Sequence, residues 1–199
     1  YVIVESEWMQ YIVAKNRVET VFKGKGEYSV IREFKGSELK GLQYIAPFPE
    51  YYQNKYENWR LKDENWMEKM IQELDSLIGW RRRSDVLWKS NDPFTNFKIY
   101  HADFITDTDG TGIGHEAPEF WDVDFELAKQ HGIHISNAMD EEGKYTTEIS
   151  DMQGIFYQDA NPIVTEKLNE KWLLFRKESI THRVPFCPRS GTPLMQKAQ

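Results

Sequence analysis

Apolar and polar residues along the chain form patterns that predict short strands and helices. Residues 1–4 and 27–34 have the pattern of strands. Residues 8–22 carry apolar side chains at helical spacing, so a helix is expected there. A second helical stripe covers residues 61–78, and Gly79 provides a natural end for it.

The middle of the chain predicts an extended segment, a tight turn and a short helix. Residues 97–105 have an extended pattern, and residues 107–112 form a turn rich in Asp and Gly. A helix is expected over residues 123–131, because Asp122 can cap its start and Gly132 can close it.

The last part of the chain predicts one more helix and a final strand. Asn161 and Pro162 are expected to open a helix, with proline in its first position, that continues to about Trp172. Residues 175–186 alternate in the manner of a strand. Short strands and scattered helices together predict one α+β domain, built as a small barrel with helices outside it.

Composition and charge narrow the class of protein. The 199 residues are 40% hydrophobic and 14% aromatic and include seven tryptophans, which argues for a packed core. A net charge of −7 counts against a dedicated nucleic-acid binder. Local basic runs at residues 23–25, 81–83 and 167–177 leave contact with one end of an RNA open, although a solvated face is the plainer interpretation.

The single cysteine, Cys187, excludes an internal disulfide framework and a cysteine zinc cluster. A reducing, cytoplasmic location is therefore expected. Nothing resembles a signal peptide, and no apolar run is long enough to span a bilayer. The chain opens directly on a predicted strand, which favours a fragment of a longer protein.

Residues 110–125 carry the most informative chemistry. Three glycines, Gly110, Gly112 and Gly114, let the backbone approach a ligand and expose its N–H groups. His115 follows, and Asp124 falls in the first turn of the predicted helix, where the helix dipole favours a carboxylate. Together these groups are suited to an amino acid or its ester, because a fixed carboxylate can hold an ammonium group.

Structural roles and other chemistries are alternatives to a binding site for an amino acid or its ester at residues 110–125. A glycine turn is often only a turn, a loop histidine is often structural, and an aspartate near a helix start is often a cap. A zinc-protease helix is disfavoured, because a second histidine is missing and Pro118 breaks the helix. Asp122 and Asp124 are two residues apart and point to different faces of a helix, so they are not expected to act as an acid–base pair.

The segment resembles the signature of the editing domains of the isoleucine, valine and leucine tRNA synthetases. The matching residues are Gly110-Thr111-Gly112, Ala117-Pro118, and Asp122 with Asp124-Phe125; His115 corresponds to the isoleucine version. Further blocks are similar in the same order along the chain. They lie at residues 36–42, 100–105, 143–146, 159–161, 177–182 and 185–194.

The resemblance implies a mainly β or α+β fold, with a small β-barrel core and peripheral helices. It implies a single editing-domain fragment over residues 1–199. Residues 53–96 show little resemblance and are expected to be a lineage-specific elaboration.

The implied activity is hydrolysis of valine wrongly attached to the tRNA for isoleucine, and of valyl-adenylate as a variant. Asp124 would anchor the α-ammonium group, His115 would exclude isoleucine from the side-chain pocket, and Phe120 would form a further wall. Gly110, Thr111 and Gly112 would approach the terminal adenosine and the ester.

No metal and no organic cofactor are expected in this domain, whereas the parent enzyme uses ATP. The expected partners are the aminoacyl end of the tRNA, the valine moiety and the rest of the synthetase chain, with no membrane and a monomeric state. The alternative is a non-catalytic module that binds aminoacyl ends or docks a partner.

Three departures from the family pattern bear on these roles. A threonine-rich pocket peptide would lie just before residue 1. Glu116 and Trp121 stand where relatives commonly have neutral or small residues, which would narrow the pocket. Ser190 accompanies Cys187 where two cysteines are frequent, which argues against a metal there.

Overall fold

The computed structural model describes residues 1–44, 46–51, 87–89, 97–179, 181 and 185–198. The chain divides into two compact units, which are described separately. The first comprises Tyr1–Tyr44 and Glu73–Glu116, and the second comprises Ile45–Gln72 and Ala117–Gln199. The helix predicted over residues 61–78 lies outside the described residues.

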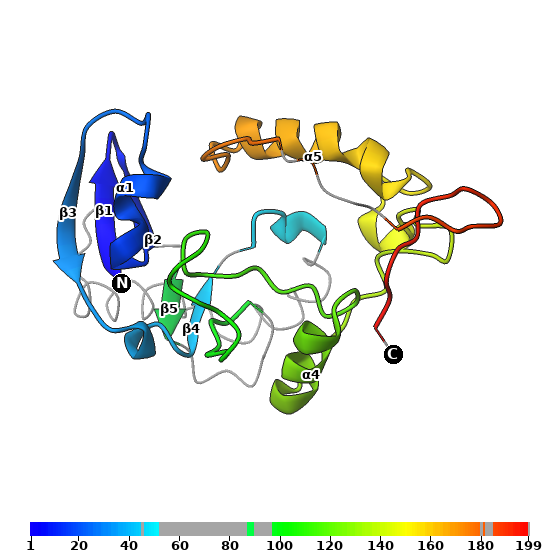
Figure 1. The fold of residues 1–199 in the computed structure, drawn as a ribbon, viewed down its shortest axis with the longest axis horizontal. Helices are drawn as coiled ribbons and strands as arrows, with labels where there is room; N and C mark the ends of the chain where they lie inside the picture. Colours follow the sequence, from blue (N-terminus) through cyan, green and yellow to red (C-terminus); the bar gives the residue numbers. More distant parts are fainter. Residues whose placement is uncertain (45, 52–86, 90–96, 180, 182–184, 199) are drawn as a thin grey trace, which may run out of the picture. The chain divides into compact units, whose positions relative to one another are not determined.

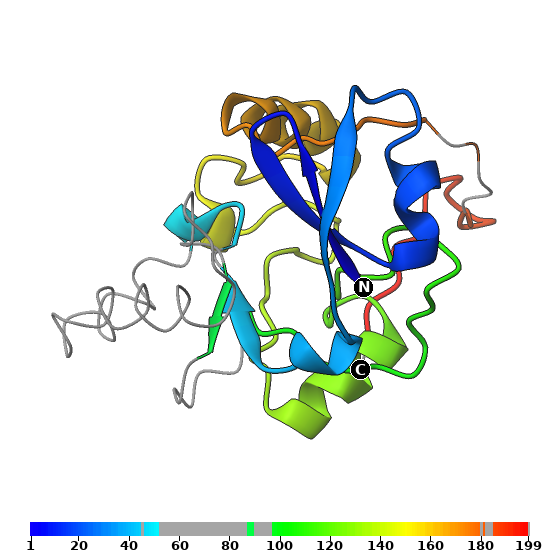
Figure 2. The same cartoon turned by 90° about the vertical axis from the view of Figure 1, so that its left-hand side faces the viewer.

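A three-stranded antiparallel sheet forms the centre of the first unit. Its order is β2-β1-β3, with β1 spanning Val2–Ser6, β2 Met9–Val13 and β3 Tyr28–Glu33. Figures 1 and 2 show the three strands side by side. Val2 and Val4 are almost fully buried, because β1 is the central strand. The strands predicted at the start of the chain and over residues 27–34 are confirmed.

The helix predicted over residues 8–22 is wrong for most of its length. Residues 9–13 form β2 instead, and only a 3-10 turn, Lys15–Arg17, and the short helix α1, Val18–Val21, follow. Glu7 lies in the turn between β1 and β2 and adopts a left-handed φ of 56°. The two strands thereby form a hairpin.

Phe22, directly after α1, packs against the sheet. Its ring is 1% exposed and lies 5.0 Å from the ring of Tyr28 and 5.5 Å from that of Tyr11. These aromatic contacts join α1 to both outer strands.

A second, two-stranded sheet pairs β4, Leu42–Tyr44, with β5, Leu87–Lys89. It follows a 3-10 helix at Gly36–Glu38. On the other side of β4, the N–H of Ile99 donates to the carbonyl of Leu42 at 2.8 Å. The extended segment predicted from residue 97 is thus confirmed only at its start, as an isolated bridge.

The described residues of the second unit form two α-helices, 3-10 helices and irregular segments. Helix α4 spans Asp122–His131 and α5 spans Tyr157–Glu170, while Pro49–Tyr51 and Thr147–Ile149 are 3-10 helices. A small core of buried residues lies against the N-terminal half of α5 and consists of Ile149, Met152 and Ala160.

Two predictions for this unit are corrected. Helix α5 begins at Tyr157 and not at residue 161, so Pro162 lies inside it. The earlier start is fixed by a contact from another segment, because the N–H of Tyr157 donates to the carbonyl of Gly143 at 3.0 Å. The strand predicted over residues 175–186 is absent from its described residues, apart from a bridge at Phe186.

The α+β class is confirmed. The described strands form two open sheets and not a closed barrel. The expected single domain stays a prediction, and most of the expected elaboration at residues 53–96 lies outside the described residues. No helix within the described ranges is long and apolar enough to cross a membrane.

Candidate functional site

The glycine turn at residues 110–112 is fastened to the sheet of the first unit. Its three successive carbonyl groups accept, in chain order, from Arg17 Nε at 3.1 Å, the Ala14 N–H at 2.8 Å and the Tyr1 hydroxyl at 2.5 Å. Asp109 holds the turn from inside, since its carboxylate accepts the N–H of residue 110 at 2.8 Å and its carbonyl accepts that of residue 112 at 3.2 Å. The backbone is therefore rigidly placed.

The two glycines of the turn differ in what requires them. Gly112 has φ +76°, and a Cβ atom there would lie 2.6 Å from the Cβ of Ala14, so a side chain has no room. Gly110 has φ +53°, with open space where a Cβ would be. Its N–H and that of Gly112 are both engaged within the turn, which leaves Thr111 as the residue whose N–H has no acceptor among the described residues.

His115 lies in the first unit and is exposed. In the described part of the chain no hydrogen bond or ion pair holds its ring. The ring is therefore accessible to solvent.

Asp124 lies in the second unit, in the first turn of α4. It is 7% exposed, and its Oδ2 accepts the backbone N–H of Ala117 at 2.7 Å. The predicted position at the helix start is confirmed. The predicted cap is wrong: Trp121 is the N-cap residue, and Asp122 is the first residue inside the helix. Gly132 ends α4 with φ 64°, as expected.

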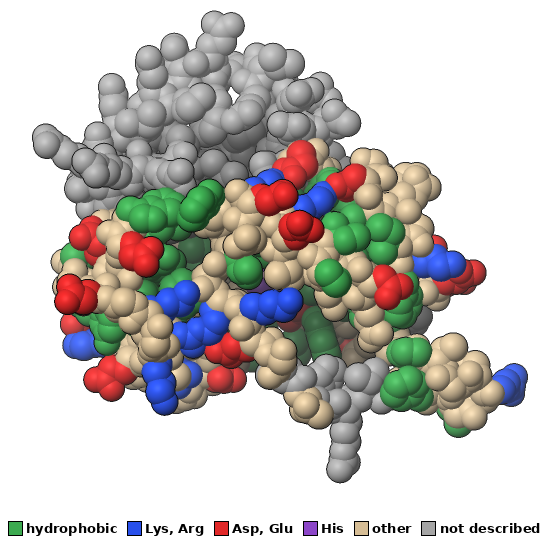
Figure 3. Space-filling view, turned by 90° about the horizontal axis from the view of Figure 1, so that it is seen from above, with side chains coloured by type: hydrophobic (Ala, Val, Ile, Leu, Met, Phe, Trp, Pro, Cys, Tyr) green, Lys and Arg blue, Asp and Glu red, His purple; other side chains and the backbone are tan. Residues whose placement is uncertain are grey.

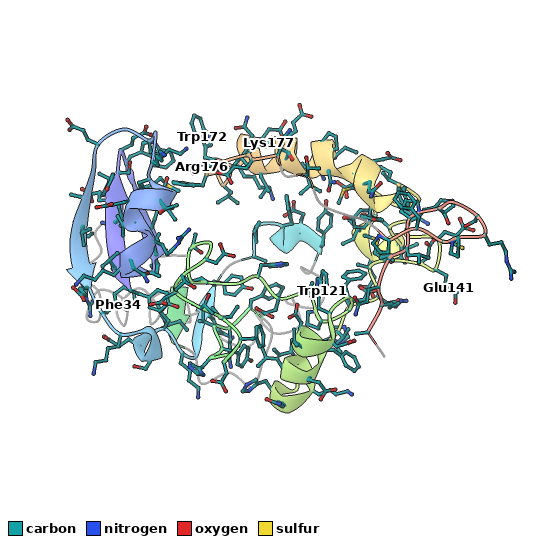
Figure 4. All side chains as sticks on the ribbon, viewed as in Figure 1. Phe34, Trp121, Glu141, Trp172, Arg176 and Lys177 are labelled. Atoms are coloured by element: carbon teal, nitrogen blue, oxygen red, sulfur yellow. The ribbon has the colours of Figure 1, made fainter. Side chains whose placement is uncertain are left out.

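Phe120 and Trp121 connect the motif to α4. The carbonyl of Ala117 accepts the Phe120 N–H at 2.9 Å and the Trp121 N–H at 3.3 Å, which closes a tight turn before the helix. Phe120 is half-buried, whereas Trp121 is 56% exposed beside α4 (Figure 4). Both residues thus directly precede the helical turn that contains Asp124.

The boundary between the units falls between Glu116 and Ala117, inside the motif. Gly110, Thr111, Gly112 and His115 belong to the first unit, and Phe120 and Asp124 belong to the second. Each of these two groups of residues is held by contacts within its own unit. The roles of the residues stay predictions.

Glu119 is a buried residue of the motif that sequence reasoning did not single out. Its side chain is only 5% exposed, and it directly precedes Phe120, the predicted pocket wall. Its hydrogen-bond partners lie far along the chain, at residues 136 and 138, so no local pattern could have indicated them.

The basic run at residues 167–177 is partly neutralised within the second unit. Lys167 donates to the carboxylate of Asp151 and, at 2.9 Å, to the hydroxyl of Tyr51. The hydrogen bond from Lys167 lowers the pKa of Asp151. Lys171 pairs with Glu50 at 2.7 Å. On the face seen in Figure 3, acidic and basic side chains are interspersed, as on a solvated surface.

Cys187 lies in a hairpin turn near the end of the chain. Its N–H donates to the carbonyl of Thr192 at 2.8 Å, and the hydroxyl of Ser190 lowers the pKa of its thiol. Within the described residues, no group of three or more His, Cys, Asp or Glu side chains could hold a metal ion.

Comparison with known proteins gives whole-chain similarity to one enzyme class. The chain is 34% identical over 203 residues, and 100% of its length, to an isoleucine–tRNA ligase of Treponema denticola. It is 30% identical to that of Picrophilus torridus and 31% identical to that of Clostridium novyi, each over 98% of its length. No protein-family model matches the chain.

The chain is thus homologous to a segment of an aminoacyl-tRNA synthetase. The synthetase is of the isoleucine type, because each of these relatives is an isoleucine–tRNA ligase, which confirms the resemblance at this level. The chain spans only 15–16% of the length of these relatives.

Proposed function

We propose that the chain is an editing domain that hydrolyses valine from the tRNA for isoleucine. The observation that carries this proposal is Asp124, a buried carboxylate at the first turn of α4, inside the motif of a chain homologous to isoleucine–tRNA ligases. The substrate is an ester whose free α-ammonium group needs a fixed anionic partner.

Asp124 is suited to that role by its surroundings. Its Oδ2 is held by the Ala117 N–H, and no described residue forms a hydrogen bond with Oδ1. The N-terminal end of a helix is a favourable place for a carboxylate, the group that pairs with an ammonium. A charge-assisted hydrogen bond to a positioned carboxylate is shorter and stronger than a neutral one.

The need for such an activity follows from substrate size. Isoleucine–tRNA ligases are themselves the established example: one missing methylene is worth only about 1–3 kcal/mol in binding, so valine is not rejected strongly enough. A second site then hydrolyses what is small enough to enter. His115 is assigned to exclude the larger isoleucine side chain, and Phe120 to form a wall.

Hydrolysis would proceed by attack of water on the ester carbonyl. Residues 110–125 contain no obvious strong base, so positioning of the water and of the ester supplies the rate enhancement. The turn at residues 110–112 contributes a rigid backbone, and a ribose hydroxyl of the substrate could assist. ATP belongs to the aminoacylation reaction of the parent enzyme and has no assigned role here.

The test is release of valine from valyl-tRNA for isoleucine by the 199-residue chain. Asp124→Asn should lower the rate at least about 30-fold, because loss of a buried charge partner costs roughly 2–5 kcal/mol. Asp122→Asn is the matched control, since Asp122 is exposed in the same helical turn and should keep the rate within about twofold. Equal rates for both variants would remove Asp124 from the site.

A second candidate is a module that binds aminoacyl ends without catalysis. The absence of an obvious strong base from residues 110–125 favours it. Titration with a valyl-adenosine analogue whose ester is replaced by an amide separates the two. Binding of the analogue without hydrolysis of valyl-tRNA supports the second candidate, whereas turnover supports the first.

A further inference from the structure

Glu119 joins separate segments of the second unit through a buried carboxylate. Its Oε2 accepts the backbone N–H of Ala138 at 3.2 Å and the hydroxyl of Ser136 at 3.4 Å. The segment it binds is itself fixed, because the N–H of Thr146 donates to the carbonyl of Ala138 at 2.9 Å. The carboxylate thus attaches the motif to an anchored loop.

The other oxygen faces the end of the chain. Oε1 is buried without a hydrogen-bond partner, and the ammonium group of Lys197 lies 3.4 Å from it. The backbone of Glu119 binds the same segment, since its carbonyl accepts the N–H of Ala198 at 3.0 Å. Lys197 also donates to Asn137 at 3.3 Å, so the tail and the loop hold each other.

These contacts converge on the turn that supports Asp124. Ala117 donates its N–H to Asp124 and accepts the N–H groups of residues 120 and 121, with Glu119 between them. A shift of Glu119 therefore moves the turn that orients both the Asp124 carboxylate and the Phe120 ring.

We propose that Glu119 is a positioning residue of the editing reaction, which fixes the carboxylate of Asp124 for the substrate ammonium through the turn at residues 117–121, with Lys197 as its second support. This inference rests on the proposed function. Glu119 does not touch the substrate: it acts through the Ala117 N–H. Its removal leaves partly buried donors on Ser136 and Ala138 without their acceptor and releases the turn.

The experiment measures binding of two probes to the 199-residue chain. One is the valyl-adenosine amide analogue, and the other is the same molecule without the α-amino group. The ratio of their affinities reports how well Asp124 is placed, because only the first probe carries the ammonium. A loss of general structure would weaken both probes alike and leave the ratio unchanged.

The wild-type chain should prefer the amino-bearing probe by at least about tenfold, the value of a charge-assisted hydrogen bond of roughly 1.4 kcal/mol. Asp124→Asn should bring the ratio close to one. Glu119→Ala should lower it about fivefold, and Glu119→Gln, which keeps an acceptor for Ala138, should restore at least half of it. Glu126→Ala removes an exposed carboxylate of α4 and should leave the ratio unchanged.

An unchanged ratio in folded Glu119→Ala overturns the inference while the proposed function stands. If Glu119→Ala does not fold, Lys197→Met decides, because Lys197 is 43% exposed and its loss leaves the core intact. A ratio at least about twofold lower in Lys197→Met supports the inference, and an unchanged ratio overturns it. A wild-type chain without preference for the ammonium overturns the proposed function, and the inference with it.

Discussion

The hydroxyl of Tyr1 donates a hydrogen bond to the carbonyl of Gly112 at 2.5 Å, across 111 positions of the chain. Together with the hydrogen bond from the Ala14 N–H to Thr111, it fixes the glycine turn against the ends of β1 and β2. Gly112 is thus needed for packing whatever the turn binds, and its presence alone is weak support for a ligand site.

Gly112→Ala should lower the free energy of unfolding by about 2–4 kcal/mol, through left-handed backbone strain and overlap with Ala14. Gly110→Ala is the matched control and should cost only about 1 kcal/mol, because its Cβ meets open space. Urea denaturation measures both. Equal losses would show that the Ala14 contact does not restrict position 112.

His115→Ala should let isoleucyl-tRNA be hydrolysed while valyl-tRNA is still cleaved, since the sieve would be lost. Because the His115 ring is exposed, the same change should alter the free energy of unfolding by less than about 0.5 kcal/mol. His101→Ala, at another exposed histidine of the first unit, is the control for both measurements. Continued exclusion of isoleucine would end the sieve assignment.

Helices α4 and α5 are followed by different residue types in the same backbone conformation, and the effect on stability can be measured. Both have a left-handed residue after the last turn: Gly132, with φ 64°, follows α4, and Trp172, with φ 58°, follows α5. Trp172→Gly should raise the free energy of unfolding by about 0.5–1 kcal/mol, since glycine adopts this conformation without steric cost. Gly132→Ala should lower it by about 1 kcal/mol. Thermal unfolding that moved in the same direction for both variants would contradict this account.

The pair of Lys167 and Asp151 should make stability depend on pH in acid. The hydrogen bond from Lys167 lowers the pKa of Asp151 in the folded state, so the stabilisation is present above the ordinary value of about 4 and is lost as pH falls toward the folded pKa. Asp151→Asn should cost at most about 1 kcal/mol at pH 7, because the carboxylate is half-exposed and screened. Denaturation at pH 7 and near pH 2 should show this difference shrinking. A constant difference would contradict the assignment.

The sequence predicts those elements whose signals are local. The end of α4 at Gly132 and the position of Asp124 in its first turn were both predictable. A helix end and an apolar stripe depend only on residues that are neighbours in the sequence. The helix predicted over residues 8–22 is wrong at residues 9–13, because apolar residues in adjacent pairs fit a helix and a strand equally well. Glu7, which makes the hairpin turn, is not a residue type that indicates one.

Other elements depend on partners far along the chain. The start of α5 is set by the carbonyl of Gly143, which no inspection of residues 157–162 could reveal. Glu119 was missed for the same reason, since Ala138 and Lys197 reach it only in the folded chain. The motif could be located from sequence, but the contacts that support it could not.

The hydrogen bonds of the glycine turn also limit how an inhibitor could engage it. Each carbonyl oxygen of residues 110–112 already accepts a hydrogen bond from the first unit, so a donor group on an inhibitor would have to share that acceptor. The Thr111 N–H has no acceptor among the described residues, so it favours compounds that present an oxygen, such as a carbonyl or a sulfonyl. Inhibitor chemistry at this turn should therefore be built from hydrogen-bond acceptors.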